Sequence, residues 1–238
     1  MSESEINARA IKENKKKIFY LDSEVMTNKA KIYESRSMIE ENRLMILSNY
    51  SAAFMGNRQL ANNNTDEIFG NRNAILSNYE TNNDVDLNFI NAQKNKTSLD
   101  FLKHRSALNS SVLEISAEMA EINSKLIDVN RKIMEANQKI VEYNAEQIAI
   151  NKDLIEGELK PANANPDSNA EIISSNKSLM AELEDNIKNN REKMEALITK
   201  SQQNSDSLIE NKKLIKERRE SIISNWDGIM NNKSKIFD

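Results

Sequence analysis

The stretch Ala120–Ile155 decides the fold of this chain and reads AEINSKLIDVNRKIMEANQKIVEYNAEQIAINKDLI. Within it an apolar residue stands at every seventh position, namely Ala120, Ile127, Met134, Val141, Ile148 and Ile155. Three positions after each of the first five stands an asparagine: Asn123, Asn130, Asn137, Asn144 and Asn151. A strict seven-residue apolar period is typical of a helix that packs along the seam of a coiled coil. We therefore assign the apolar residue to heptad position a and the asparagine to position d.

The same period covers the rest of the chain and predicts three helices. It runs from Ile11 to Ile75, from Val85 to Ile155 and from Ile173 to Ile236. Poor helix formers separate the first two blocks, and Gly157, Pro161 and Pro166 separate the last two. We expect helix 1 over about 5–80, helix 2 over about 85–156, a loop over 157–167 and helix 3 over about 168–236, with Asp167 or Ser168 as its cap.

One irregularity lies inside helix 1. After Leu60 the period resumes one residue late, with Ile68 and Ile75 at a and Asn71 and Asn78 at d. The segment around 57–66 is either a true turn or a distortion within one continuous helix that absorbs the extra residue. We favour the distortion, because a turn there would produce three helices of unequal length.

Composition supports long helices that meet along narrow stripes. The chain has only 4 Gly and 2 Pro and is 38% hydrophobic, which leaves few turns and too little apolar mass for a thick core. Each predicted helix has about 70 residues and a length of about 105 Å. The predicted fold is all-α, a single elongated domain over 1–238. It is a long antiparallel three-helix bundle or coiled coil with Ile at a and Asn at d.

The asparagines at d are the candidate site. An unsatisfied buried amide costs about 1–3 kcal/mol, so a line of them must find partners. Candidate partners are one another's amides, backbone carbonyls, internal waters and anions, and we expect amides of the three helices to meet on a shared axis. The predicted core line comprises Asn14, Asn28, Asn42, Asn49, Asn95, Asn109, Asn123, Asn130, Asn137, Asn144, Asn151, Asn176, Asn190, Asn204, Asn211, Asn225 and Asn232.

Two interpretations of this line stay open. Polar residues at core positions fix the register and the number of strands, so the line can be a purely structural device. The repeat also resembles, locally, the stalks of trimeric autotransporter adhesins, which implies asparagines that face the axis and hold anions. Those stalks usually carry threonine after the asparagine, whereas Arg131, Gln138, Ala145 and Lys152 stand there in this chain.

The sequence lacks the constellations that enzymes need. It has no cysteine, and His104 is its only histidine. It contains no glycine-rich phosphate loop and no Glu-x-x-His pair of the kind that binds iron in helical bundles. We therefore expect no catalytic residue, no metal ligand and no cofactor, apart from bound anions or internal waters on the asparagine line.

Charge and hydropathy bear on partners and location. The net charge is −4 and both signs are well mixed, which argues against nucleic-acid binding. No apolar run is long enough to span a membrane, and Met1 to Lys17 does not read as a signal peptide. The default expectation is a cytoplasmic location, and export by a route without a signal peptide stays open.

The leading functional hypothesis is a non-enzymatic rod that serves as a spacer, scaffold or assembly subunit, with a protein partner or self-association. A membrane-active helical protein is the alternative, either a curvature binder that resembles BAR domains or a component that resembles helical pore-forming toxins. A third hypothesis is an anion-binding bundle with asparagine layers.

Overall fold

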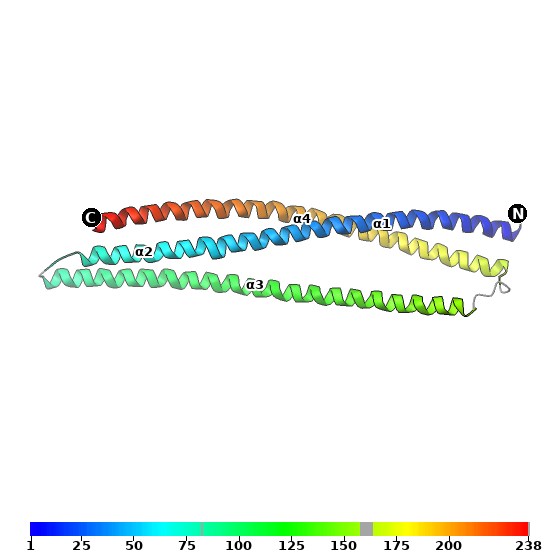
Figure 1. Cartoon of the computed structure of the whole chain (residues 1–238), viewed down its shortest axis with the longest axis horizontal. Coiled ribbons are helices and arrows are strands. Elements are labelled where there is room, and N and C mark those ends of the chain that lie inside the picture. The colour runs from blue at the N-terminus through cyan, green and yellow to red at the C-terminus, as the bar shows by residue number, and fades with distance from the viewer. Residues whose placement is uncertain (82, 158–163, 238) are drawn as a thin grey trace. The chain divides into compact units, whose positions relative to one another are not determined.

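A computed structural model gives the structure of the chain and describes residues 1–81, 83–157 and 164–237. The elements are α1 (Glu3–Tyr50), the π-helix η1 (Ser51–Asn57), α2 (Arg58–Ser77), α3 (Asp84–Ile155) and α4 (Pro166–Phe237) (Figure 1). Because η1 joins α1 to α2 without a turn, the chain forms three long helical runs. The predicted all-α fold with three long antiparallel helices is confirmed.

Side chains cap the helices at their N-termini. At α1, Ser2 and Glu5 form a capping box in which Ser2 N donates to Glu5 Oε2 over 2.8 Å and Glu5 N donates to Ser2 Oγ over 3.3 Å. At α3, Val85 N donates to Asn83 Oδ1 over 2.9 Å. The polar residues before α3 therefore end one helix and begin the next, as their types predict.

Helix α4 begins earlier than the sequence predicts. Its cap is Asn165, whose Oδ1 accepts from Ser168 N over 2.8 Å, and the expected caps Asp167 and Ser168 lie inside the helix. Pro166 is the first helical residue, a position where its missing N–H has no partner to lose and its fixed φ suits the helix. Most of the predicted loop, 158–163, lies outside the described residues.

The one-residue irregularity is absorbed by η1. A π-helix closes i→i+5 hydrogen bonds, and Arg58 N donates to Ala53 O in this pattern. One wide turn therefore contains one more residue than an α-helical turn. The distortion starts at Ser51, before the predicted segment 57–66. As a result Asn57 and Asn64 are buried, whereas the uncorrected period would place Gly56 and Asn63 at d.

The chain divides into two compact units. Unit 1 comprises Met1–Leu60 and Lys160–Ile222, and unit 2 comprises Ala61–Leu159 and Ile223–Asp238. Unit 1 thus contains α1, η1 and most of α4. Unit 2 contains most of α2, all of α3 and the last turns of α4.

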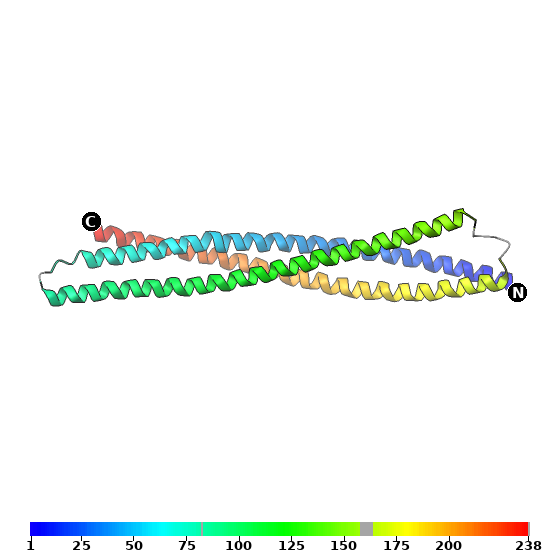
Figure 2. The same ribbon diagram turned by 90° about the horizontal axis from the view of Figure 1, so that it is seen from below.

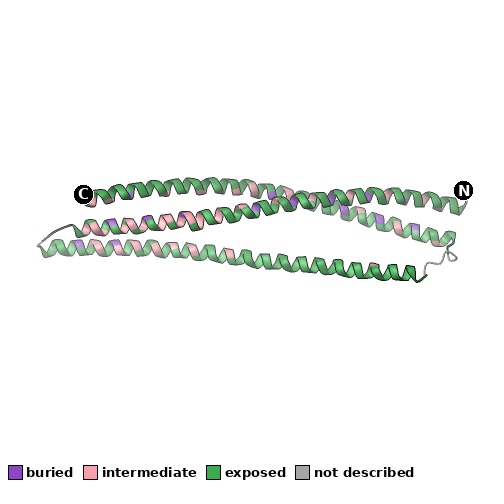
Figure 3. Cartoon of the chain, viewed as in Figure 1, coloured by how far each residue is buried: buried purple, intermediate pink, exposed green. Residues whose placement is uncertain are grey.

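In unit 1 two parallel helices pack along one edge. Position d of α1 faces position a of α4, and Leu21, Met180 and Ile187 form an apolar cluster there, with Leu21 only 1% exposed. Figure 3 shows the buried residues as single positions spaced along each helix rather than as a broad buried face. Position a of α1 lies outside this contact, so that Ile11 is 51% exposed. The core of unit 1 is therefore one residue wide.

In unit 2 three helices meet. Stacked rings of Phe69 and Phe101, with centroids 4.5 Å apart, join α2 to the first half of α3. These two segments run side by side in opposite directions in both views (Figures 1 and 2). Lys233 Nζ of α4 pairs with Glu67 Oε2 of α2 over 2.7 Å.

The second half of α3 is exposed almost throughout, as Figure 3 shows. It includes the stretch 120–155, whose a residues Ile127 and Met134 are exposed.

We predict that deletion of Ala52 removes the π-turn and leaves thermal stability equal or higher, because α1 and α4 then have equal spacing between successive contacts. Deletion of Ala30 is the matched control. It also removes an exposed alanine, but no π-turn compensates for it, so the part of α1 on one side of the deletion is rotated relative to α4. Each buried amide that loses its partner should then cost about 1–3 kcal/mol, and about 1 kcal/mol lowers Tm by about 2–4 °C in a chain of this size. Circular dichroism melts compare the two, and an equal loss of Tm in both would contradict the assignment of η1.

Candidate functional site

A ladder of amide-to-carbonyl hydrogen bonds connects the first helical run to α4. In each rung an asparagine Nδ2 donates to the backbone oxygen of a residue at position a of α4. In unit 1 the rungs are Asn7–Pro166 (2.9 Å), Asn14–Ile173 (3.3 Å), Asn28–Ile187 (3.0 Å), Asn42–Ser201 (2.7 Å), Asn49–Leu208 (2.9 Å) and Asn57–Ile215 (2.8 Å). In unit 2 they are Asn71–Ile229 (3.2 Å) and Asn78–Ile236 (3.5 Å).

The numbering of the rungs records the register. Donor and acceptor differ by 159 positions up to Asn49 and by 158 from Asn57 onward. A constant difference means that the two helices run parallel and in step. The loss of one position falls across η1, which is the physical consequence of its extra residue.

The partner of each amide is a backbone carbonyl, so the expectation that amides of three helices meet on a shared axis is wrong for these rungs. A helical carbonyl oxygen has a second lone pair after accepting from its own helix, and the amide occupies it. One helix supplies the amide and the other supplies only backbone. No amide on the opposite helix is needed, and Nδ2 of each rung has a partner other than an anion.

The structure buries only part of the predicted line. Asn14, Asn28 and Asn42 are buried, and Asn49 and Asn176 are half-buried. The remaining predicted residues are exposed. Those of α4 and of the first half of α3 lie away from the packed edge of their helix, and those of the second half of α3 lie in a stretch that is exposed almost throughout. The exposed residues are Asn95, Asn109, Asn123, Asn130, Asn137, Asn144, Asn151, Asn190, Asn204, Asn211, Asn225 and Asn232.

Sequence reasoning missed Asn57 and Asn64, which are both buried. The signal that could have found them is the late restart of the period at Ile68. Counting back in sevens from Asn71 reaches Asn64 and Asn57, and this places the extra residue before Asn57.

Ion pairs flank the ladder in unit 1. Lys17 Nζ lies 2.7 Å from Glu184 Oε2, and Arg191 Nη2 lies 2.6 Å from Glu24 Oε2. Arg191 Nε also donates to Asn28 Oδ1 over 3.4 Å, which joins this pair to a rung. The hydrogen bond from Lys17 holds the pKa of the Glu184 carboxyl below its usual range, against the opposing effect of partial desolvation.

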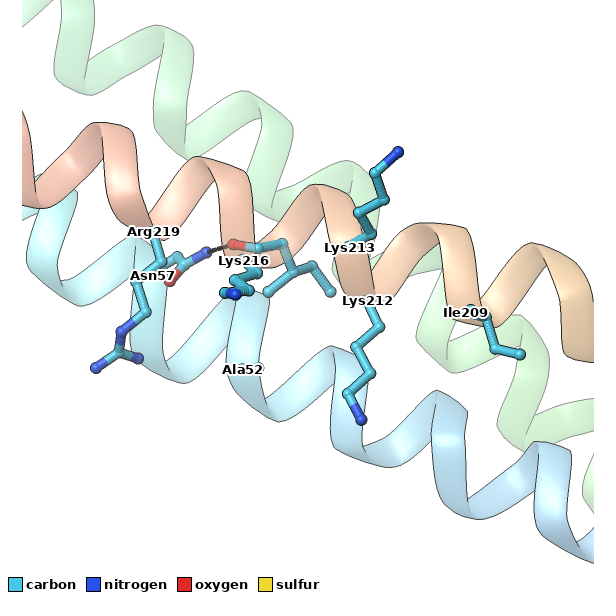
Figure 4. Close-up of a pocket in the computed structure, with 8 residues that line it drawn as sticks. Ala52, Asn57, Ile209, Lys212, Lys213, Lys216 and Arg219 are labelled. Carbon is cyan, nitrogen blue, oxygen red and sulfur yellow. Dashed lines mark hydrogen bonds between the residues drawn. The ribbon is translucent and has the colours of Figure 1, made fainter.

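A cavity of about 470 Å³ opens beside η1 in unit 1. Figure 4 shows Asn57 turned toward the Ile215 carbonyl, with the side chains of Lys216 and Arg219 close to it and that of Lys213 directed away. None of the lining residues is acidic: Ala52, Asn57, Ile209, Lys212, Lys213, Ile215, Lys216 and Arg219. The cavity is therefore basic, with apolar walls.

The single histidine lies elsewhere. His104 is exposed and borders a cavity of about 270 Å³ in unit 2, together with Phe69, Phe101 and the ion pair of Arg72 with Asp100. Among the described residues, no three acidic or histidine side chains come together as a metal site. Within the same residues, no helix combines the length and the hydropathy that crossing a membrane requires.

Comparison of the chain with models of protein families, with curated proteins and with solved structures found no match.

We predict that Asn28→Ala destabilises the protein by about 1–3 kcal/mol, because it removes a buried amide with partners on both sides. Asn190→Ala is the matched control, since Asn190 has an exposed side chain on a long helix and should change stability by less than about 0.5 kcal/mol. Urea unfolding followed by circular dichroism measures both. Equal effects would contradict the ladder as a determinant of stability.

The Lys17–Glu184 pair predicts a dependence of stability on pH. Because the pKa of Glu184 is lowered in the folded state, its contribution is present above the ordinary glutamate value of about 4.3. It disappears as the pH falls through the lowered value. Glu184→Gln should therefore be less stable than the parent at neutral pH and equal to it in strong acid. Glu182→Gln, which alters an exposed acid on the same helix, should show no such convergence in unfolding measured across pH.

Proposed function

We propose that the protein is a non-enzymatic structural or interaction protein, a stiff helical spacer, scaffold or assembly subunit. The observation that carries this proposal is the ladder, which fixes two helices in one parallel register from Asn14 to Asn57 within unit 1 and again at Asn71 and Asn78 within unit 2. A polar contact that recurs every heptad resists sliding, and resistance to sliding is what a spacer needs.

The proportions of the helices support the same function. α3 and α4 have 72 residues each, so each is about 108 Å long. The cores that hold them are narrow, and most of the side chains are exposed and polar. Such helices offer a long surface for protein partners or for self-association, in the cytoplasm by default.

The ladder does not favour the hypothesis of anions between asparagine layers. One of the two N–H donors on the Nδ2 of each rung already goes to a carbonyl, so only the second is left for an anion. Membrane activity is best decided by direct measurement, because the net charge of −4 gives no general attraction to anionic lipid.

We predict that X-ray scattering of the purified protein gives a rod about 105–110 Å long. The length of the rod should decrease when whole heptads are removed from all three helices together. Removal of Lys29–Ser35, Lys188–Met194 and Arg131–Asn137 together takes seven residues from each helix in phase. This variant should remain folded and be shorter by about 10 Å.

Removal of only Lys29–Ser35 is the control, because it shifts α1 against α4 by a heptad and should lower Tm. If scattering shows a compact particle, the proposal that the protein is a spacer is wrong. Co-sedimentation of the intact protein with liposomes of anionic lipid would support the membrane-active alternative instead.

A further inference from the structure

The cavity beside η1 carries an inference beyond scaffolding and independent of it. Among the described side chains, three buried polar atoms have no hydrogen-bond partner: Asn57 Oδ1, Arg58 Nε and Arg105 Nε. Two of the three lie on consecutive residues at the end of the π-turn. Unsatisfied buried atoms are uncommon in folded proteins and ask for an explanation such as a missing ligand.

Asn57 is held as a rigid part of this cavity. The residue is 7% exposed, and its Nδ2 is fixed by the 2.8 Å bond to Ile215 O. The amide therefore cannot turn to pair its oxygen without losing that bond. Oδ1 is left as an acceptor that needs a hydrogen-bond donor.

Cationic side chains line the same cavity as this acceptor. Arg219 reaches across from α4 to η1, where its Nη1 lies 3.7 Å from the position that a Cβ atom on Gly56 would occupy. Neither Arg219 nor Lys212 makes an ion pair with any described residue, whereas Lys216 pairs only loosely with Glu220, at 3.9 Å. Figure 4 shows Lys216 and Arg219 on the same side of α4 as Asn57.

We propose that this cavity binds a phosphate group that also presents a hydroxyl donor. Its anionic oxygens accept from Arg219 and Lys216, and the hydroxyl donates to Asn57 Oδ1. Arginine and lysine are the usual phosphate-binding side chains. The acceptor adds selectivity, because hydrogen phosphate carries a P–OH group at neutral pH and sulfate carries none.

Two sources share this chemistry. One is inorganic phosphate, and the other is a small phosphate ester whose organic part carries hydroxyl groups. The apolar walls formed by Ala52, Ile209 and Ile215, together with the volume of about 470 Å³, leave room for an organic part beside the phosphate.

The test is isothermal titration calorimetry of the full chain with phosphate, sulfate, glycerol 3-phosphate and phenyl phosphate at constant ionic strength. Phosphate should bind about tenfold or more tightly than sulfate, since one hydrogen bond to a buried acceptor separates the two. Binding of glycerol 3-phosphate in preference to phenyl phosphate would identify the hydroxylated ester as the source. Preference for inorganic phosphate over both would identify the free ion.

Three variants assign the site. Asn57→Leu should weaken phosphate binding about tenfold and abolish the preference over sulfate, and Leu21 shows that leucine fits position d. Arg219→Gln should weaken the binding of both phosphate and sulfate. Lys200→Gln is the control: it removes an exposed cation of α4 away from the cavity and should leave the binding of both anions unchanged. Deletion of Ala52 removes the π-turn and should abolish binding in a chain that still folds.

Equal affinity for phosphate and sulfate in the parent chain would overturn the proposal, and so would the absence of binding. Unchanged selectivity in Asn57→Leu would also overturn it, since binding would then reflect only the local positive charge. Circular dichroism of each variant separates loss of binding from loss of folding.

Discussion

The hydrogen bond from an asparagine amide to a backbone carbonyl of α4 is the constraint on which the rest of the structure depends. A heptad pattern by itself leaves two helices free to slide by seven residues, because apolar residues recur at the same spacing on both. The side chains at position d of α1 remove this freedom. Leu21 and Ser35 interrupt the asparagines and lie 159 positions before Met180 and Met194, whereas the rungs lie against Pro, Ile, Leu or Ser. If α1 slipped by one heptad along α4, Asn14 would lie beside Met180 and Leu21 beside Ile187, so the side chains that pack together would change.

The same constraint explains why the chain tolerates an odd residue. The rungs change their numbering by one across η1, and so do three ion pairs that share one heptad spacing. Lys17–Glu184 and Glu24–Arg191 differ by 167 positions, whereas Glu67–Lys233 differs by 166. Two chemically different kinds of contact therefore record one inserted residue. A π-turn costs less than a rotation of the following helix by about 100°, which would carry every later asparagine out of reach of its carbonyl.

Periodicity was sufficient to predict the three helices, the end of α3 near Gly157 and the burial of Asn14, Asn28 and Asn42. These features follow from local rules, because each depends on residues within one or two turns. The partner of the amides could not be predicted, since every carbonyl of every helix offers the same lone pair and only packing selects one. The burial of Asn57 was missed because the position of the extra residue was not known. A seven-residue count locates that position only to within two heptads. The stretch 120–155 has the most regular pattern in the chain and yet is exposed, because a pattern shows which face of a helix can pack and not how much of it does.

The choice of asparagine at position d determines what kind of structure the chain can be. Leu21 is the most buried of the described residues and sits at d without disturbing the helix, so apolar residues fit this seam. Leucine at every rung would bury more apolar surface, whereas a neutral hydrogen bond contributes only about 0.5–1.5 kcal/mol net. The amides therefore add less stability than leucines would, but each one is satisfied only where a particular carbonyl faces it. Wherever a rung forms, a carbonyl at position a of α4 must face the amide, and the packing of Leu21 and Ser35 selects which heptad supplies that carbonyl. A protein whose task is to hold partners at fixed positions depends on that specificity more than on the depth of its core, and this is the physical reason to regard the ladder as the basis of a spacer.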